Sequence, residues 1–446
     1  MKKSLTALSF ALVGLCLLAS PLARSATATQ AQIAPNIPNA LHLLDDNFYA
    51  KLDWHAVTSQ ATLAVVAAAK QHKPAHFACV ARADDLASAT QCIQASILAT
   101  ARNTGADPID LSYAALRGVA KGTHDRWAAF FSPKEFARFN QLFTPNSISG
   151  VGVLLQVIKG QPAAAYFVMP GSPADQAGLR SGDQIISVDG HPTLGLPLDG
   201  VSHLLRGASG SHVSVSTINA DGAHATYDIV RSVVRPPTVI YQQLGSNIGY
   251  IAVDIFGSDT GAEFATDVNR LRQSGAKAFV IDLRYDGGGM VDAALQVSSQ
   301  FVSNNPIVSV ESRGSQVTTD YGDGFPAPSE PIVVLVNGYT ASASEIVAAA
   351  LQDNGVAKLV GTRTFGKGVM QDVYSLPDGS GFKFTYARYF TPNHHNINGT
   401  GIAPNVVVAE NPHAVLGDPK HDKQLQSAMA MLAAQIASMQ AASTQP

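Results

Sequence analysis

Charged side chains are scarce in this chain, and neither sign dominates. Lysine, arginine, aspartate and glutamate make up 14% of the 446 residues, whereas about 25% is usual for globular domains. The 30 basic and 33 acidic side chains leave a formal net charge of -3. Proteins that bind nucleic acid neutralise phosphates with a basic surface, so this balance argues against a nucleic-acid partner. With 46% apolar residues, the chain can bury several cores and form several domains.

Only the first residues contain a long apolar run. Two lysines precede an apolar stretch from about Leu5 to Ala19, and small residues follow it. This order is typical of a secretory signal, so we predict a signal peptide over residues 1–28. An uncleaved membrane anchor is the alternative, but the run is shorter than the roughly 20 residues that span a bilayer. We therefore expect export to a bacterial periplasm or cell envelope. The mature protein is expected to be soluble, with membrane association only if the anchor is kept.

Cysteine is also rare, with three residues in the chain. Cys16 lies inside the apolar run, which leaves Cys79 and Cys92, thirteen positions apart. In an oxidising compartment such an even pair favours a disulfide, and two buried apolar thiols are the alternative. The spacing matches no zinc pattern, so we expect no metal site here.

The pattern of apolar residues and glycines after residue 28 divides the chain into four parts. Apolar residues at three- and four-residue spacing predict a helical N-terminal region over residues 29–148. Short β-rich runs separated by glycines predict a β-rich module over residues 149–233. Alternating apolar runs and helical patterns predict an α/β core with a mainly parallel sheet over residues 234–412. Residues 413–446 predict a C-terminal helix for packing or oligomerisation.

A serine lies where a predicted buried strand turns into a predicted helix. The strand is the apolar run at residues 332–336, and Ser342-Ala343-Ser344-Glu345 opens the helical pattern. A helix start offers free backbone N–H groups and a positive dipole end, which stabilise the oxyanion formed when serine attacks an amide. The same four residues are also a capping box, in which the serine and the glutamate only cap the helix. Taken alone, the segment favours the cap and leaves a nucleophile as the alternative.

A nucleophilic serine needs a base, and Lys367 is the best candidate. None of the thirteen histidines forms an evident His-Asp-Ser pattern, whereas Lys367 lies between two glycines, twenty-five residues after Ser342. A lysine acts as a base only when desolvation or a positive potential lowers its pKa. Flanking glycines let a substrate approach closely, and we expect Gln371, four residues later, to orient the amine by a hydrogen bond. A lysine in an exposed turn is the alternative.

A glycine triplet follows another predicted buried strand. The segment Ile281-Asp-Leu-Arg-Tyr-Asp-Gly-Gly-Gly289 ends in three glycines, whose main-chain N–H groups can point at an oxyanion. The triplet fits neither the Gly-x-Gly-x-x-Gly spacing of dinucleotide sites nor a P-loop, so no organic cofactor is expected.

Taken together and in order, these segments resemble the C-terminal processing (tail-specific) serine protease family over roughly residues 110–410. The matching segments are Asp282-Leu-Arg-Tyr-Asp-Gly-Gly-Gly289, Thr340-Ala-Ser-Ala-Ser-Glu-Ile-Val347, Leu351-Gln-Asp-Asn-Gly355, Gly361-Thr-Arg-Thr-Phe-Gly-Lys-Gly368 and Gly401-Ile-Ala-Pro-Asn405. The resemblance implies a multidomain α/β protein with a ClpP/crotonase-like catalytic core. It also implies serine endopeptidase activity without a metal or an organic cofactor.

The resemblance assigns roles to single residues. Ser342 is expected to be the nucleophile, Lys367 the general base, and Gln371 the residue that supports the lysine. The main-chain amides of Gly288 and Ala343 are expected to form the oxyanion hole. One segment departs from the family, which commonly has Asn-Asn-Pro-Gly-Gly where residues 285–289 of this chain read Tyr-Asp-Gly-Gly-Gly. The stiff proline is therefore missing beside the expected oxyanion hole.

The β-rich module resembles the PDZ domain of the same family. The matching segments are Ser149-Gly-Val-Gly152, Gly171-Ser-Pro-Ala174, Ala177-Gly-Leu-Arg-Ser-Gly-Asp183 and Val188-Asp-Gly190. PDZ domains bind a peptide tail as an added strand and hold its carboxylate on backbone amides. We expect that carboxylate site at Gly150, Val151, Gly152 and Val153, and protein substrates bound through their C-terminal tails. A plain β-turn is the alternative for these residues, and an adaptor protein and an oligomer stay open.

Two further functions compete with an active protease. A catalytically inactive tail-binding scaffold of the cell envelope is motivated by the altered glycine turn, but Ser342, Lys367 and Gln371 are all present. A ligand-carrying relative of the same core would have an apolar pocket in place of the dyad. The prediction is an exported serine endopeptidase that cleaves proteins near their C-termini with a Ser-Lys dyad.

Overall fold

The described chain divides into two compact units. The computed structural model describes residues 36–69, 77, 79–143, 147–157, 160–219, 221–245, 247–324, 329–411 and 417–443. One unit comprises Met1–Pro133 and Val373–Phe384, and the other comprises Lys134–Asp372 and Thr385–Pro446. The predicted signal peptide lies outside the described residues. Among the helices that the structure describes, none is both long enough and apolar enough to cross a membrane.

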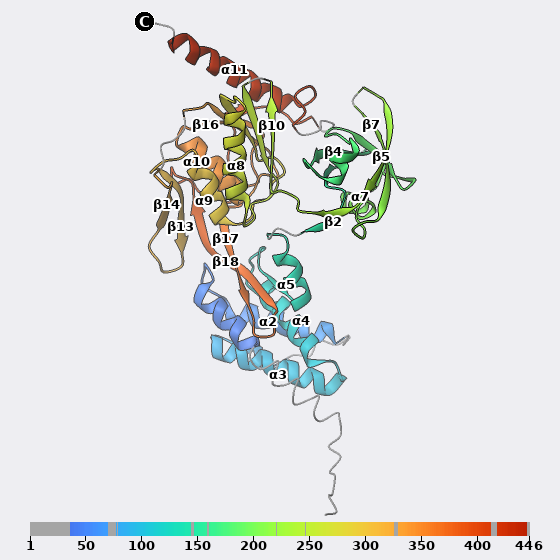
Figure 1. Cartoon of the computed structure of the whole chain (residues 1–446). Coiled ribbons are helices and arrows are strands. Elements are labelled where there is room, and N and C mark those ends of the chain that lie inside the picture. The colour runs from blue at the N-terminus through green and yellow to red at the C-terminus, as the bar shows by residue number, and fades with distance from the viewer. Residues whose placement is uncertain are drawn as a thin grey trace, which may run out of the picture. The chain divides into compact units, whose positions relative to one another are not determined.

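The first unit is a bundle of helices, as predicted for the N-terminal region (Figure 1). Its helices are residues 36–47, α2 (Trp54–Ala68), η1 (Val80–Arg82), α3 (Leu86–Thr104) and α4 (Pro108–Gly122). The side chains of Asp53, Asp85 and Asp107 each accept a hydrogen bond from an N–H group of the first helical turn. These caps explain where the three long helices begin, because the first N–H groups of a helix have no partner within it.

A β-hairpin completes the core of this unit. Strands β17 (Val369–Ser375) and β18 (Gly381–Phe390) pair with each other, and β1 (Ala129–Phe131) pairs antiparallel with the start of β18. Leu376, Phe382 and Phe384 are buried among the apolar side chains of the helices. The units therefore divide the chain differently from the expected domains, since residues 373–384 fall within the expected α/β core. Order along the chain does not reveal such a hairpin.

Cys79 and Cys92 are joined by a disulfide in the first unit, with their Cα atoms 5.5 Å apart. We expect the Cys79→Ser/Cys92→Ser double variant to lose about 3 kcal/mol of unfolding free energy, because a bond that closes a loop of this length restricts the unfolded chain. Urea unfolding with and without reductant measures the effect. The unfolding free energy of the variant should not depend on the reductant. Equal unfolding free energies for the variant and the oxidised wild type would contradict the expectation.

The second unit contains a β-rich module at residues 148–234. Strands β2 (Ile148–Gly150) and β9 (Ser232–Val234) pair antiparallel at its base. The main sheet has the order β3-β4-β5-β7-β8, with β6 beside β5. Its strands are β3 (Val153–Gln156), β4 (Ala163–Val168), β5 (Gln184–Val188), β6 (His191–Pro192), β7 (His212–Ile218) and β8 (His224–Val230). Helices α6 (Pro173–Ala177) and α7 (Leu198–Leu205) complete the module, and β3 forms one edge of the sheet.

The α/β core of the second unit is built on a mainly parallel sheet, as predicted. The strands are β10 (Val239–Leu244), β11 (Ile248–Val253), β12 (Ala278–Asp282), β15 (Ile332–Val336), β16 (Ala357–Gly361) and β19 (Val406–Val407), in that order across the sheet. Only β10 runs antiparallel to its neighbour among these strands. The central strands β11, β12 and β15 are buried along their whole length, which explains why apolar residues make up most of their sequences.

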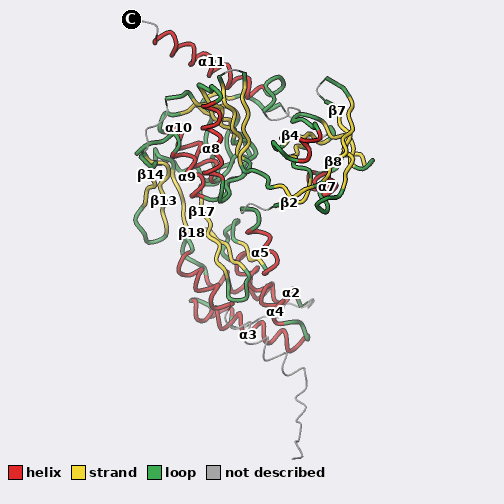
Figure 2. The backbone as a smooth tube through the Cα atoms, viewed as in Figure 1, coloured by secondary structure: helices red, strands yellow, loops and turns green. Residues whose placement is uncertain are grey.

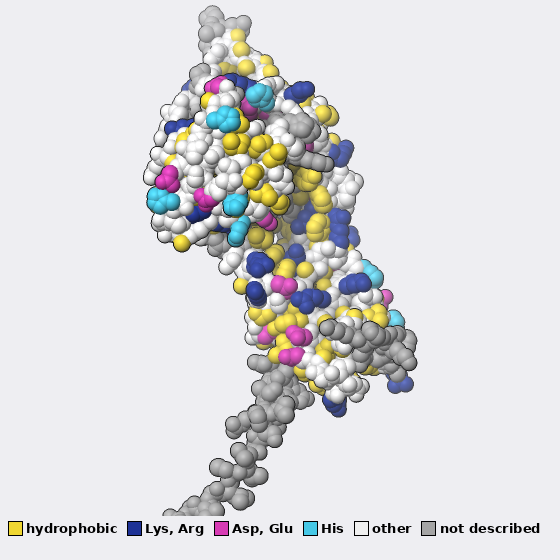
Figure 3. Space-filling view, turned by 90° about the vertical axis from the view of Figure 1, so that its right-hand side faces the viewer, with side chains coloured by type: hydrophobic (Ala, Val, Ile, Leu, Met, Phe, Trp, Pro, Cys, Tyr) yellow, Lys and Arg dark blue, Asp and Glu magenta, His cyan; other side chains and the backbone are white. Residues whose placement is uncertain are grey.

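Helices cover both faces of this sheet (Figures 1 and 2). Helices α8 (Thr260–Gln273), α9 (Val291–Ser299) and α10 (Ala343–Asp353) contribute to one apolar core, and α11 (Lys423–Ser443) contributes to the other. The remaining described elements of the unit are α5 (Pro133–Asn140), β13 (Pro306–Ser312) and β14 (Thr318–Tyr321). On the face that Figure 3 shows, charged side chains of both signs are interspersed with apolar and polar ones, in keeping with the balanced composition.

Because neighbouring core strands are parallel, the loops that carry the predicted site residues come together at one edge of the sheet. Strands β12, β15 and β16 are neighbours, and their carboxyl ends lie at the same edge of the sheet. The glycine triplet follows β12, Ser342 follows β15, and Lys367 follows β16. In open α/β sheets, this edge is the usual place for a ligand site.

Candidate active site

Ser342 lies on a sharp turn between β15 and α10. Its backbone has φ 58° and ψ −118°, a positive φ that residues other than glycine rarely adopt. Such strain is stored at functional sites, and a serine on a strained strand-to-helix turn exposes its hydroxyl for attack. The turn is held by Thr340, whose Oγ1 accepts from Asn337 N at 3.0 Å and donates to Leu283 O at 2.7 Å. The hydrogen bonds of the Thr340 side chain therefore help to hold the strained backbone of Ser342 in place.

Glu345 is fully buried and joins the turn of Ser342 to that of Lys367. Its Oε2 accepts from the backbone N of Ser342 at 3.0 Å and from that of Lys367 at 2.8 Å. Its Oε1 accepts from Gly366 N at 2.7 Å and from Thr364 Oγ1 at 2.5 Å. A buried carboxylate is costly unless it is fully hydrogen bonded, and these four donors meet that need. One carboxylate oxygen thus brings the two backbones to within hydrogen-bonding reach of the same point.

The glycines beside Lys367 allow its turn to pack closely against residues 396–401. A Cβ on Gly366, whose φ is 86°, would lie 2.7 Å from Gly401 N. A Cβ on Gly368 would lie 2.7 Å from Asn398 N. Both distances are shorter than real Cβ contacts, so packing requires both glycines, and the positive φ of Gly366 is a second reason for a glycine there.

Tyr389 on β18 connects the same two turns a second time. Its hydroxyl donates to Ser342 O at 3.3 Å, and its backbone N donates to Gly368 O at 3.1 Å. Burial raises the pKa of Tyr389 well above the usual value for tyrosine, so the hydroxyl stays protonated and remains a donor.

Gln371 is half-buried on β17, and its amide is oriented by two hydrogen bonds. Its Nε2 donates to Val369 O and to Thr385 Oγ1, each at 3.3 Å. The side-chain amide is therefore held close to the Lys367 turn, on the strand that the turn leads into. Its support of the lysine amine stays a prediction.

The glycine triplet packs against the nucleophile turn. A Cβ on Gly288, whose φ is 96°, would lie 2.6 Å from Ala341 O and 2.8 Å from Ala343 N. The two amides predicted for the oxyanion hole are thus close together. The N–H of Gly288 donates to Asp286 Oδ1 at 2.8 Å, a contact that the sequence does not predict.

A buried charge network fixes the start of this loop. The Arg284 guanidinium pairs with Asp282 and with Asp422, each at 2.6 Å, and also donates to Gln424. Tyr250 on β11 donates its hydroxyl to Asp282 at 2.8 Å. Because the partners come from two strands and from the start of α11, the network connects the loop to the sheet and to the helix on one of its faces.

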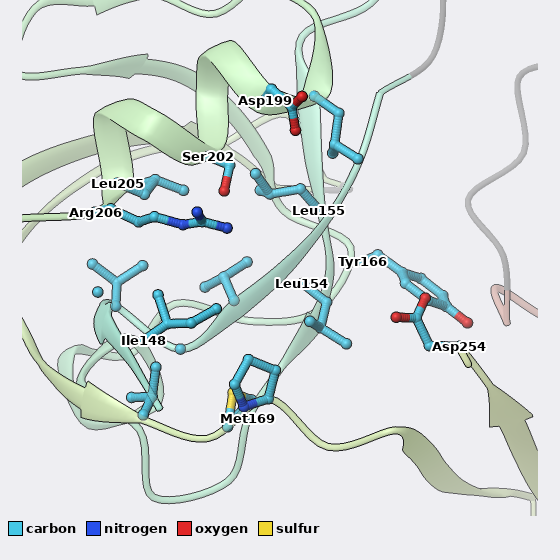
Figure 4. A pocket seen from close by; sticks show the side chains of 17 residues that line it. Ile148, Leu154, Leu155, Tyr166, Met169, Asp199, Ser202, Leu205, Arg206 and Asp254 are labelled. Carbon is cyan, nitrogen blue, oxygen red and sulfur yellow. The ribbon is translucent and has the colours of Figure 1, made fainter. Parts of the chain in front are cut away.

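The predicted carboxylate site lines a cavity of about 250 Å³, which the β-rich module forms together with Pro236 and Asp254. Gly150, Val151, Gly152 and Val153 lie along it, together with residues of β3 and α7. In Figure 4, Ser202, Leu205 and Arg206 lie on one side of this space, with Ile148 and Leu154 opposite. Gly152 has φ 81° and its carbonyl accepts from Met169 N at 3.0 Å, which fixes the turn.

Two family descriptions match the chain. The description "Peptidase family S41" matches residues 247–408, and "PDZ domain" matches residues 167–217. A carboxyl-terminal-processing protease of Picosynechococcus is 36% identical over 335 residues, which cover 72% of this chain and 79% of that protein. The chain belongs to this carboxyl-terminal-processing protease family. It is accordingly a serine-type peptidase.

Further comparisons agree with this membership. A carboxyl-terminal-processing protease of Synechocystis is 33% identical over 306 residues, covering 67% of this chain and 71% of that protein. The solved structure of an S41-type protein from Bacteroides fragilis is 18% identical and has a TM-score of 0.51, covering 69% of this chain and 86% of that one. The latter similarity concerns the fold alone. The family resemblance, the fold class and the serine-type peptidase predicted from the sequence are confirmed.

Most of the predicted site residues meet at one edge of the core sheet. Ser342, Lys367, Gly288 and Ala343 are brought together there, and residues 150–153 lie in the separate cavity of the PDZ module. Sequence reasoning assigned Glu345 only a capping role, and the structure adds its bonds to the Lys367 turn. It missed Tyr389, Thr340 and Asp286. For Asp286, an acidic residue within an expected oxyanion loop was the signal available.

We expect Glu345→Gln to impair both activity and folding of this family member. An amide nitrogen would face two N–H donors in place of one carboxylate oxygen, so unfolding free energy should fall by about 2 kcal/mol or more. Displacement of the dyad should lower kcat about a hundredfold. Urea unfolding and reporter hydrolysis measure the two effects.

The matched control is Glu330→Gln, which changes a glutamate of the same unit whose bond is to Arg272 near the surface. Its effect should stay below about 1 kcal/mol. Equal effects of the two substitutions would contradict the special role of Glu345.

Proposed function

We propose that the chain is an exported serine endopeptidase that cleaves protein substrates near their C-termini, with Ser342 as nucleophile and Lys367 as general base. The observation that carries this proposal is the shared hydrogen bonding of both residues' backbone amides to Glu345 Oε2. If Ser342 only capped the helix, Glu345 would have no need to bind the backbone of the Lys367 turn as well. The positive φ of Ser342 further supports a nucleophile, because strain without a function is a net cost to folding.

The mechanism is acyl transfer in two halves. The neutral amine of Lys367 takes the Ser342 hydroxyl proton as Oγ attacks the substrate carbonyl, and the tetrahedral oxyanion accepts hydrogen bonds from Gly288 N and Ala343 N. The C–N bond then breaks as the lysine ammonium protonates the leaving amine. Water attacks the acyl-enzyme with Lys367 again as base, and Ser342 regains its proton as the acid product leaves. Gln371 orients the lysine amine during both halves.

The PDZ module supplies a site for substrate tails. Strand β3 is at the edge of its sheet, where an extended tail can add as a further strand beside α7. The turn at residues 150–153 would hold the terminal carboxylate on backbone N–H groups. Arg206 lines the same cavity and adds a positive charge, and the apolar side chains of Val151 and Leu205 favour an apolar last residue.

The inactive tail-binding scaffold is the second candidate. One observation favours it, namely that Gly288 N–H donates to Asp286 in a hole that needs this amide for substrate. A protein that binds tails with free carboxylates and releases no product under any condition would be this scaffold.

Hydrolysis of an unfolded reporter tests the dyad. We expect the mature protein to release a C-terminal peptide, and Ser342→Ala and Lys367→Ala to lower the rate to below about one ten-thousandth, because each removes a partner that acts only with the other. Product masses identify the cleaved bond. Ser274→Ala, at an exposed serine directly after α8, serves as the serine control and should keep most of the activity. Full activity of Lys367→Ala would exclude the proposed base.

Blocking the tail tests the recognition site. Amidation of the reporter's C-terminus should raise KM about tenfold or more, because it removes a charged hydrogen-bond acceptor. Arg206→Gln should weaken binding of the free-acid reporter and leave that of the amidated reporter nearly unchanged. Arg180→Gln is the control, since Arg180 is an exposed arginine of the same module that pairs with Asp175. Equal KM values for the two reporters would rule out recognition of the carboxylate.

A further inference from the structure

Asp286 is a buried acidic side chain in the loop that carries the oxyanion donor. Only 1% of the residue is exposed. Its Oδ1 accepts from Gly288 N at 2.8 Å, whereas its Oδ2 is buried and has no hydrogen-bond partner among the residues that the structure describes. Arg284, two residues earlier, is already paired with Asp282 and Asp422. This carboxyl therefore faces the amide that should bind the substrate's oxyanion.

The backbone of Asp286 holds this arrangement rigidly against α10. Its carbonyl accepts from Ala341 N and from Ser344 Oγ, each at 3.1 Å. These bonds join the residues on both sides of Ser342 to the oxyanion loop. The Asp286 carboxyl consequently keeps its position beside Gly288 while the nucleophile turn stays folded.

An ionised Asp286 would oppose the reaction in two ways. A carboxylate binds an N–H group about twice as strongly as a neutral carbonyl does, so it would compete with the oxyanion for Gly288. It would also place a negative charge beside the negative charge that develops in the transition state. A neutral carboxylic acid weakens the first effect and removes the second.

We propose that Asp286 is a positioning residue of the oxyanion hole, which makes the Gly288 amide available to substrate only while its carboxyl is neutral. This proposal rests on the proposed protease function and adds a pH-sensitive control to it. An asparagine at this place would be neutral at every pH, whereas the aspartate of this chain makes that neutrality conditional on pH.

The surroundings favour the neutral form. Burial raises the pKa of Asp286 well above its usual value, and the negative charge of Asp254, after β11, raises it further. The hydrogen bond from Gly288 and the hydroxyl of Ser344 act in the opposite direction and lower this pKa. The other charged groups nearby are Arg284 in the same loop, Glu345 on α10 and Lys367 after β16, of which Arg284 and Glu345 are bound to the partners given above. The acid is therefore neutral below its raised pKa, and activity falls as pH rises through that value.

The test compares pH profiles of kcat/KM for the mature wild type and Asp286→Asn. Both contain Lys367, so its titration cancels in the ratio of the two profiles. We expect the variant-to-wild-type ratio to be flat at low pH and to rise about tenfold per pH unit above the Asp286 pKa. Thermal unfolding verifies that the variant is folded. A ratio that is flat at every pH in an active enzyme would overturn the proposal.

Asp254→Asn is the matched control, because it removes a neighbouring acid that does not touch Gly288. Its profile should keep the fall at high pH and shift it to lower pH, since the raising charge is gone. If the fall in kcat/KM at high pH disappears in Asp254→Asn, the titrating group is Asp254 and not Asp286, and the proposal is wrong. A wild type that cleaves no reporter at any pH would instead overturn the protease function and this inference with it.

A second measurement does not depend on activity. Infrared difference spectra between Ser342→Ala and Ser342→Ala/Asp286→Asn should contain the C=O stretch of a protonated carboxylic acid at neutral pH. That band should titrate at the pH where the kinetic ratio begins to rise. A carboxylate band in its place at neutral pH would contradict a neutral Asp286.

Discussion

The arrangement of the site depends on the hydrogen bonds that the buried carboxylate of Glu345 accepts. A charge this deep is tolerated only because four donors surround it, and those donors come from the two turns that carry Ser342 and Lys367. The constraint is mutual, since the carboxylate holds each turn against the other. It explains why a glutamate that caps a helix is followed, after the next strand, by Thr364 and a Gly-Lys-Gly turn.

Close backbone packing fixes the position of the oxyanion loop. Gly288 lies against Ala341 and Ala343, and a Cβ on Gly289 would collide with the carbonyl oxygen of Phe256. The loop cannot move away from the nucleophile turn without losing these contacts. A single titrating side chain in it, Asp286, can therefore influence the hole electrostatically while the backbone stays in place.

Much of this architecture could be predicted from the sequence, because it is written in local patterns. Unbroken apolar runs identified the central parallel strands, and the capping box located the start of α10. The partners of Glu345 around the Lys367 turn and the hydroxyl of Tyr389 could not be found in this way, since their contacts join segments 19 to 47 residues apart. The grouping of residues 373–384 with the N-terminal helices also rests on contacts between distant segments, which order along the chain does not show.

The most direct test of the Ser-Lys assembly is to find which residue a peptidyl phosphonate labels. Such a reagent bonds only to a serine that a neighbouring base has activated. The account predicts a single adduct, mapped by mass spectrometry to Ser342, in the wild type and none in Lys367→Ala. An adduct on a different residue, or equal labelling of Ser342 in the lysine variant, would contradict it.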